Sequence, residues 1–163
     1  MIKKIKIRLA SSSFILLTIL WVTLVSLSGC GKDTSIDDYK AKMETFYERL
    51  SDYDHAINAL DPYSDSAIPK MLGYLDDIAD MIKEMASYQV PEHFYGVDEL
   101  AKQADEYISE AVSLFNQAFL AAEYDDNIAD AATENYERAN LRLRYIAEIL
   151  RGDIPEEIFT YAN

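Results

Sequence analysis

Apolar residues recur along this chain at alternating spacings of three and four, which is the period of an amphipathic helix. The clearest run is Ile36, Tyr39, Met43, Phe46, Leu50, Tyr53, Ile57 and Leu60. A seam sustained this long is typical of helices that pack side by side. We expect the first helix to take Ser35 as its N-cap and to end at Asp61-Pro62, because the residue before a proline is disfavoured in the helical region.

Breakers divide the following residues into three more helical segments. The second starts at Ser66, since an earlier start would put Pro69 beyond the first turn. Pro91 is well placed to open the third. The fourth follows the turn 124–127, which supplies N-caps, and stops at Arg151-Gly152, where glycine can take the left-handed C′ conformation. The three seams are Ile68, Met71, Leu75, Ile78, Ile82 and Met85; Val97, Ala101, Ala104, Ile108, Ala111, Phe115, Ala118 and Ala122; and Ala129, Ala132, Tyr136, Ala139, Leu143, Ile146 and Leu150.

Four amphipathic helices joined by short turns predict an all-α fold, an antiparallel up-down-up-down four-helix bundle. The bundle covers residues 35–152, and residues 153–163 form a C-terminal tail. The many alanines in the third and fourth seams would let those two helices approach closely. A three-helix arrangement, with the second helix broken or displaced, is the less favoured alternative.

Residues 1–30 follow a different pattern. Four basic residues (Lys3, Lys4, Lys6 and Arg8) precede an uncharged stretch from 9 to 29, which ends in Leu27-Ser28-Gly29-Cys30. This order of parts resembles the signal of a bacterial lipoprotein, with a lipobox before the cysteine. The resemblance implies that residues 1–29 are a signal peptide, that cleavage precedes Cys30, and that its thiol is lipidated. The alternative is an uncleaved signal-anchor helix, which we disfavour because Ser26 and Ser28 close the apolar run.

Lipidation would fix both the location and the charge of the mature protein. It implies an extracytoplasmic chain held to the cell membrane by acylated Cys30, with residues 30–34 as a short tether. Residues 1–29 hold four of the 15 lysines and arginines and none of the 29 acidic residues, so 11 basic residues remain and the net charge is −18. This acidity argues against nucleic acid as a partner. Cys30 is the only cysteine, so lipidation leaves no thiol for a disulfide or a metal.

The short tether also predicts an orientation, in which the first and fourth helices start and end near the membrane. Arg138, Arg142, Arg144 and Arg151 lie along the last helix. One interpretation is that they make the membrane-proximal end less acidic and contact lipid headgroups. The favoured alternative is that they pair with Asp98, Glu99, Asp105 and Glu106 of the third helix.

Signatures of catalysis, metal binding and cofactor binding are missing from the sequence. His55 and His93 lack the Glu-x-x-His spacing of di-iron bundles, and we place them on a helix surface and in a turn. The acidic clusters at 61–65 and 125–130 lack EF-hand order, and helix capping explains them better than calcium binding. We therefore predict no cofactor, no metal site and no enzymatic activity.

Two features are candidates for binding. Residues 111–122, which include Phe115 and Phe119, carry no charge, so this segment is either deeply buried or an exposed patch for a partner. Asn135, Arg138 and Arg142 are spaced three and four residues apart, and Tyr136 lies next to the first of them. They either line a pocket for an anion or a polar ligand, or form a polar layer that fixes register.

These features favour a structural or protein-interaction module that meets an envelope protein. A bundle that binds or senses a small ligand is the alternative, and an enzyme comes last. An exposed apolar patch in residues 111–122 would favour the first function. A cavity lined by Tyr136, Arg138 or Arg142 would favour the second. The mature part resembles uncharacterised helical lipoproteins of low-GC Gram-positive bacteria, a likeness that transfers no site and leaves the oligomeric state undefined.

Overall fold

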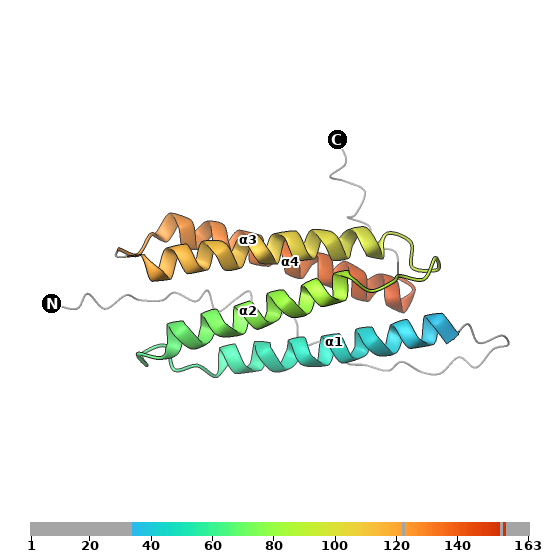
Figure 1. Cartoon of the computed structure of the whole chain (residues 1–163), viewed down its shortest axis with the longest axis horizontal. Coiled ribbons are helices and arrows are strands. Elements are labelled where there is room, and N and C mark those ends of the chain that lie inside the picture. The colour runs from blue at the N-terminus through green and yellow to red at the C-terminus, as the bar shows by residue number, and fades with distance from the viewer. Residues whose placement is uncertain (1–33, 122, 154, 156–163) are drawn as a thin grey trace.

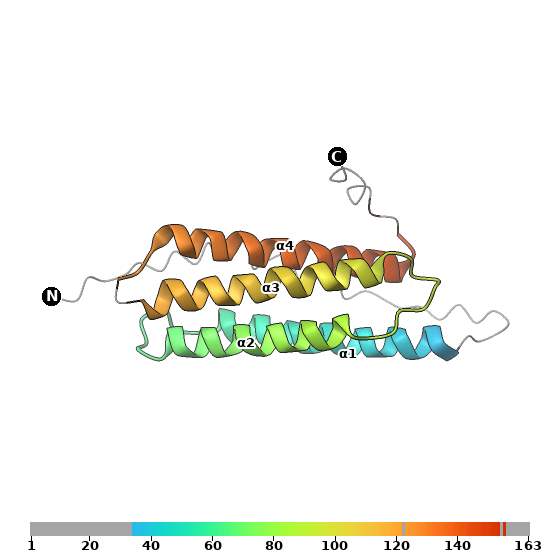
Figure 2. The same ribbon diagram turned by 45° about the horizontal axis from the view of Figure 1, so that its top comes forward.

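The described part of the chain consists of four antiparallel helices. The computed structural model describes residues 34–121, 123–153 and 155, and within them the helices are α1 (Thr34–Asn58), α2 (Ala67–Ala86), α3 (Val97–Leu120) and α4 (Asp126–Arg151). Successive helices run in opposite directions, which is the predicted up-down-up-down bundle (Figure 1). The start of α1, the α2–α3 turn and the end of α4 share one end, here called the near end. The α1–α2 and α3–α4 turns share the other, here called the far end (Figures 1 and 2).

The four apolar seams meet in the core as their spacing predicts. The largest fully buried side chains all occupy predicted seam positions; they are Met43, Ile78, Ile82, Met85, Val97, Ile108, Leu143 and Ile146. Each helix therefore buries the stripe that its own periodicity marks, and burial of such apolar area is the main favourable term in folding.

The α3–α4 pair is the most closely packed part of the bundle. These two helices make more close backbone contacts with each other than any other pair, followed by α2–α3 and then α1–α2. Small side chains make this approach possible, and the buried alanines of the two helices are Ala101, Ala104, Ala111, Ala118, Ala129, Ala132, Ala139 and Ala147. The prediction that alanines bring these helices together is confirmed.

A tyrosine links the first helix to the last. The Tyr47 hydroxyl donates a hydrogen bond to the Leu143 carbonyl oxygen, 2.6 Å away. Burial is the largest cause that raises the pKa of Tyr47. The hydroxyl thus stays protonated and remains a donor, which ties α1 to α4.

Several predicted helix ends are confirmed. Asp125 caps α4, because its carboxylate accepts hydrogen bonds from the N–H groups of Asn127 and Ile128. Gly152 ends the same helix at a φ of 91°, and the N–H groups of Gly152 and Asp153 bond back to the carbonyls of Ile149 and Glu148, which is a Schellman motif. In α2, Ser66 is the N-cap.

Two predicted helix starts are wrong. Helix α1 begins at Thr34, one residue earlier than expected, so Ser35 lies in its first turn and is not the N-cap. Pro91 does not open α3, which begins at Val97 instead. The reason is Gly96, whose left-handed φ of 84° separates the turn 91–95 from the helix.

Candidate functional site

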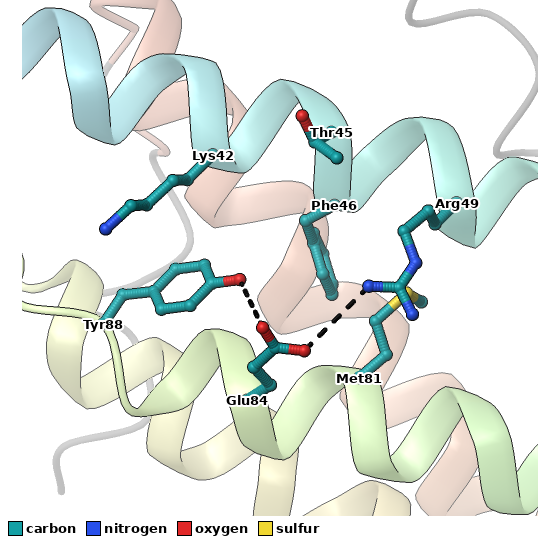
Figure 3. Close-up of a pocket in the computed structure, with 7 residues that line it drawn as sticks. All are labelled: Lys42, Thr45, Phe46, Arg49, Met81, Glu84 and Tyr88. Carbon is teal, nitrogen blue, oxygen red and sulfur yellow. Dashed lines mark hydrogen bonds and ion pairs between the residues drawn. The ribbon is translucent and has the colours of Figure 1, made fainter.

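A cleft of about 180 Å³ lies between α1 and α2 (Figure 3). Its lining residues are Lys42, Thr45, Phe46 and Arg49 of α1, Met81 and Glu84 of α2, and Tyr88 in the turn that follows α2. Charged side chains of both helices, Lys42 and Arg49 on α1 and Glu84 on α2, thus meet above an apolar base.

Helical spacing explains why these side chains converge. Lys42, Thr45 and Arg49 are spaced three and four residues apart, so they share one face of α1. Met81, Glu84 and Tyr88 repeat that spacing on α2 and just beyond its end. Phe46 and Met81 are buried and form the base of the cleft.

Glu84 is the centre of the polar contacts. It accepts a hydrogen bond from the Tyr88 hydroxyl at 3.3 Å and lies 3.9 Å from Arg49 (Figure 3). The ammonium of Lys42 lies 5.4 Å from the centre of the Tyr88 ring. The side chains of Arg49 and Glu84 are 52% and 59% exposed, so water screens this ion pair and it contributes less than about 1 kcal/mol.

The charges of the cleft suit a small organic anion. Burial, first, and then the charge of Glu84 and its hydrogen bond raise the pKa of Tyr88, while Arg49 opposes them. The phenol is therefore a hydrogen-bond donor at neutral pH. Two cations stand against one carboxylate here, although the whole chain has a net charge of −14. An anion could replace the weakly held Glu84 beside Arg49 and rest its apolar part on Phe46.

The predicted polar residues of α4 do not line this cleft. Arg142 donates to the Gln103 side chain at 3.2 Å and lies 4.9 Å from the centre of the Tyr107 ring. Arg138 pairs with Glu134 and lies on the same ring at 5.7 Å. The structure thus brings Arg138 and Arg142 together around an aromatic residue of α3.

Two neighbours of these arginines point elsewhere. The Asn135 side chain donates to the carbonyl of Ala131 in its own helix at 3.0 Å. Tyr136 is buried, and its pKa is raised to about 12 by burial and also by the charge of Asp54, while its hydrogen bond to Asn140 lowers it. Tyr136 therefore belongs to a buried polar group between α1 and α4, separate from the arginines.

Asp54 is a buried carboxylate that the sequence patterns did not single out. It is 5% exposed, and one of its oxygens, Oδ1, has no hydrogen-bond partner among the described residues. Burial, as the largest cause, raises its pKa, while His55 and the Asn58 side chain lower it. Asp54 falls four residues after Leu50 and three before Ile57 on the seam of α1, a position that an apolar pattern does not mark when the residue is a carboxylate.

The other predicted arginine pairs are also replaced by local ones. Arg144 lies 3.9 Å from Glu148, and Arg151 lies 3.5 Å from Asp153. Within the described residues, none of the four arginines pairs with the predicted acids of α3, so that prediction is wrong. Arg138 and Arg144 pair instead with acids four residues away on their own helix, which lie within easy reach.

An aromatic cluster occupies the far end. The rings of Phe115 and Phe119 stack at 6.2 Å, and Tyr124 lies 5.2 Å from Phe119. Phe115 and Phe119 are half-buried, whereas Leu120 is 69% exposed. The uncharged segment is therefore buried on one side, at Ala111 and Ala118, and exposes an apolar surface where α3 ends.

The two acidic turns use aspartates in local backbone hydrogen bonds, inside the turn at 61–65 and as a helix cap at 125. Asp61 accepts a hydrogen bond from the Tyr63 N–H at 3.0 Å, and Asp125 caps α4. His55 and His93 are exposed, as predicted.

No group of three or more histidine, cysteine or acidic side chains suited to a metal ion occurs in residues 34–121, 123–153 and 155. Over the same ranges no helix combines the length and the apolar character needed to cross a membrane.

No family model, curated protein or solved structure matches this chain. Cys30 and the rest of the predicted signal lie outside the described residues, as does the tail from 156 onward.

The cleft residues Lys42, Arg49, Glu84 and Tyr88 were not identified from the sequence. Their spacing is visible there, but a single helix pattern does not reveal which polar face will meet a neighbour.

Proposed function

We propose that this protein is a lipoprotein, anchored outside the cytoplasm by acylated Cys30, whose bundle acts as a structural or protein-interaction module. The order of parts in residues 1–30 supports the anchor. Helix α1 begins only four residues after Cys30, so the near end of the bundle would lie at the membrane. The far end would then face other envelope proteins. The proposal is of binding and not of catalysis, and the net charge of −14 disfavours nucleic acid.

The exposed Leu120 is the observation that carries the interaction proposal. It extends the cluster of Phe119 and Tyr124 to the surface at the far end, where a partner has access. The acidic residues Glu123 and Asp126 lie beside it in the chain and are exposed. A complementary partner is therefore an envelope protein with an apolar contact surface framed by lysine or arginine.

Photo-crosslinking in intact cells tests this surface. Replacing Leu120 with a photoreactive phenylalanine should give one discrete adduct with an envelope protein. The same replacement at exposed Ser113, one heptad earlier on the same helix, is the matched control and should give none. The purified partner should bind the bundle less tightly as salt rises, because the acidic rim contributes to attraction. Equal adducts from both positions, or binding that survives Leu120→Lys, would contradict the proposal.

The anchor has its own test. Mass spectrometry of the protein purified from cell membranes should find an N-terminal Cys30 that carries a diacylglyceryl group. Cys30→Ala should abolish incorporation of labelled fatty acid. An unmodified Cys30 in an intact chain that begins at Met1 would support the signal-anchor alternative.

A small-ligand function is the second candidate, and the two cations of the α1–α2 cleft favour it. Benzoate and inorganic phosphate are suitable probes, since one has an apolar ring and the other does not. We expect benzoate to raise the thermal unfolding midpoint more than phosphate, and Arg49→Gln to remove the difference. Lys102→Gln, at an exposed position outside the cleft, is the control. Equal effects of benzoate on all three proteins would exclude the cleft as its site.

A further inference from the structure

The α2–α3 turn at the near end holds a tyrosine outward. Phe94 is 2% exposed, whereas the next residue, Tyr95, is 92% exposed. Hydrogen bonds from the Phe94 N–H to the Pro91 carbonyl at 2.9 Å and from the Val97 N–H to the Phe94 carbonyl at 3.2 Å fix the turn on either side. Tyr95 therefore projects from a turn whose position is set by a buried neighbour.

This turn packs against the beginning of α1. The centres of the Phe94 and Tyr39 rings are 5.7 Å apart, and the ammonium of Lys40 lies 5.6 Å from the centre of the Phe94 ring. Tyr39 is five residues into α1, which is about 8 Å along the helix axis. The chain from Cys30 to Thr34 spans at most about 14 Å. An anchor at Cys30 would thus bring the turn to the surface of the bilayer.

We propose that the turn 91–96 contacts the bilayer and that Tyr95 inserts its ring among the lipid headgroups. Tyrosine suits this position because its ring is apolar and its hydroxyl is polar, and it is enriched at membrane–water interfaces. The contact is a second attachment beside the acyl chains, and it holds the bundle upright with its far end away from the membrane. This inference rests on the proposed acylation of Cys30.

The charges of the near end set the depth and the lipid preference of this contact. Asp37, Asp38 and Glu92 are exposed there, whereas exposed Arg151 pairs with Asp153 and partly buried Lys40 lies over the Phe94 ring, so acidic groups predominate. Carboxylates are repelled by the negative surface potential of anionic lipids. The ring therefore enters only the headgroup region, and it contacts zwitterionic lipid more closely than anionic lipid.

Tryptophan fluorescence tests the inference with a matched pair of positions. Trp21 is the only tryptophan in the chain and lies in the proposed signal peptide, so the acylated mature protein is free of tryptophan, and Trp21→Phe gives the same background in any uncleaved chain. Tyr95→Trp then reports on the near end and Tyr63→Trp on the far end, where Tyr63 is also 92% exposed. Both full-length variants are produced in cells, purified from membranes and reconstituted into phosphatidylcholine vesicles brominated near the headgroups. Helix content by circular dichroism confirms the fold, and mass spectrometry of the same samples reports acylation of Cys30.

We expect the lipid to quench Tyr95→Trp and shift its emission to the blue, and to leave Tyr63→Trp unchanged. Added anionic lipid should reduce the quenching, and salt should restore it. Acylated protein in which Tyr95→Trp is not quenched would overturn the inference while leaving the anchor intact. Quenching of both variants would also overturn it, because the bundle would then lie flat. Absence of acylation would contradict the proposed function separately.

Hydrogen exchange provides a second readout that needs no substitution. The amides of the turn 91–96 should exchange more slowly in protein on vesicles than in protein in detergent, while those of the far-end turn 59–66 should not change. Equal exchange of the two turns under both conditions would count against the contact.

Discussion

The two helix pairs of this bundle, α3–α4 and α1–α2, are held together by side chains of different size. Alanines such as Ala104 and Ala139 are fully buried in α3 and α4, and these helices make the most extensive close contacts in the described structure. In α1 and α2 the buried positions carry larger residues, among them Phe46, Met81 and Met85, and the close contacts between these helices are fewer. The α1–α2 cleft lies on the looser side.

The difference shows how one periodic pattern gives two kinds of helix pair. Small side chains let two backbones approach, and large ones hold them apart. Where the axes are farther apart, long polar side chains such as Arg49 and Glu84 have space to meet above an apolar base. The spacing of the seam residues therefore determines that a bundle forms. The size of those residues determines where a cleft can open between two of its helices.

The largest expected effect comes from removing a large side chain on the loose side. Phe46→Ala should lower the free energy of unfolding by about 3–5 kcal/mol, because it removes a buried ring and enlarges the cleft. Chemical denaturation monitored by circular dichroism measures this. Phe119→Ala, at a half-buried position on α3, is the comparison and should cost less. Equal costs would mean that α1–α2 packing does not depend on large residues.

Enlarging an alanine on the tight side should have the next largest effect. Ala139 is 0% exposed, and Ala139→Leu should destabilise the protein by about 1–3 kcal/mol through overpacking. Ala79→Leu, at a half-buried position on α2, should cost less in the same denaturation assay. If Ala139→Leu were tolerated without loss, the close approach of α3 and α4 would not depend on alanine.

Removing the link between α1 and α4 should have a moderate effect. Tyr47→Phe deletes the hydroxyl that donates to the Leu143 carbonyl and should cost about 0.5–1.5 kcal/mol. The control is Tyr39→Phe, because the buried Tyr39 hydroxyl has no hydrogen-bond partner within the part of the chain that the structure describes. If the control lost as much stability as Tyr47→Phe, the loss would not be due to the hydrogen bond to Leu143.

The smallest effect concerns Asp54, and its size depends on pH. Burial raises its pKa in the folded protein above the ordinary value of 3.8. As pH rises, Asp54 therefore ionises in the unfolded chain before it ionises in the folded protein. The stability that protonated Asp54 contributes is fully present below pH 3.8 and is lost as pH rises through the pKa of the folded protein. Asp54→Asn should then raise the unfolding midpoint at neutral pH but not below pH 3.8. Exposed Asp52→Asn is the control, and an equal gain there would remove burial as the cause.

The sequence predicted features of the fold that depend on the spacing within one helix. Met43, Ile82 and Leu143 were placed in the core correctly because apolar periodicity marks the buried stripe directly. Asp125 and Gly152 were placed correctly because capping is local chemistry. These features require no knowledge of the neighbouring helices.

Features that depend on how helices meet were not predictable in the same way. Phe94 lies in a turn, where no apolar periodicity marks the buried residues. It is buried because it contacts Tyr39. Asp54 lies on a seam, but a carboxylate does not register in an apolar pattern. The pairing of Arg49 with Glu84 depends on the rotation of α1 against α2, which the sequence of neither helix states.

The Tyr47–Leu143 hydrogen bond also bears on the order of folding. It joins residues 96 positions apart, whereas α3 and α4 are connected by a short turn. Contacts between segments close in sequence form faster than contacts between distant ones. The contacts within α1–α2 and within α3–α4 are therefore expected to form early, and the contact of α1 with α4 to form late. Since chains are made from the N-terminus, α1 can pack on α2 first, and its hydrogen bond to α4 can form only after the last helix has been synthesised.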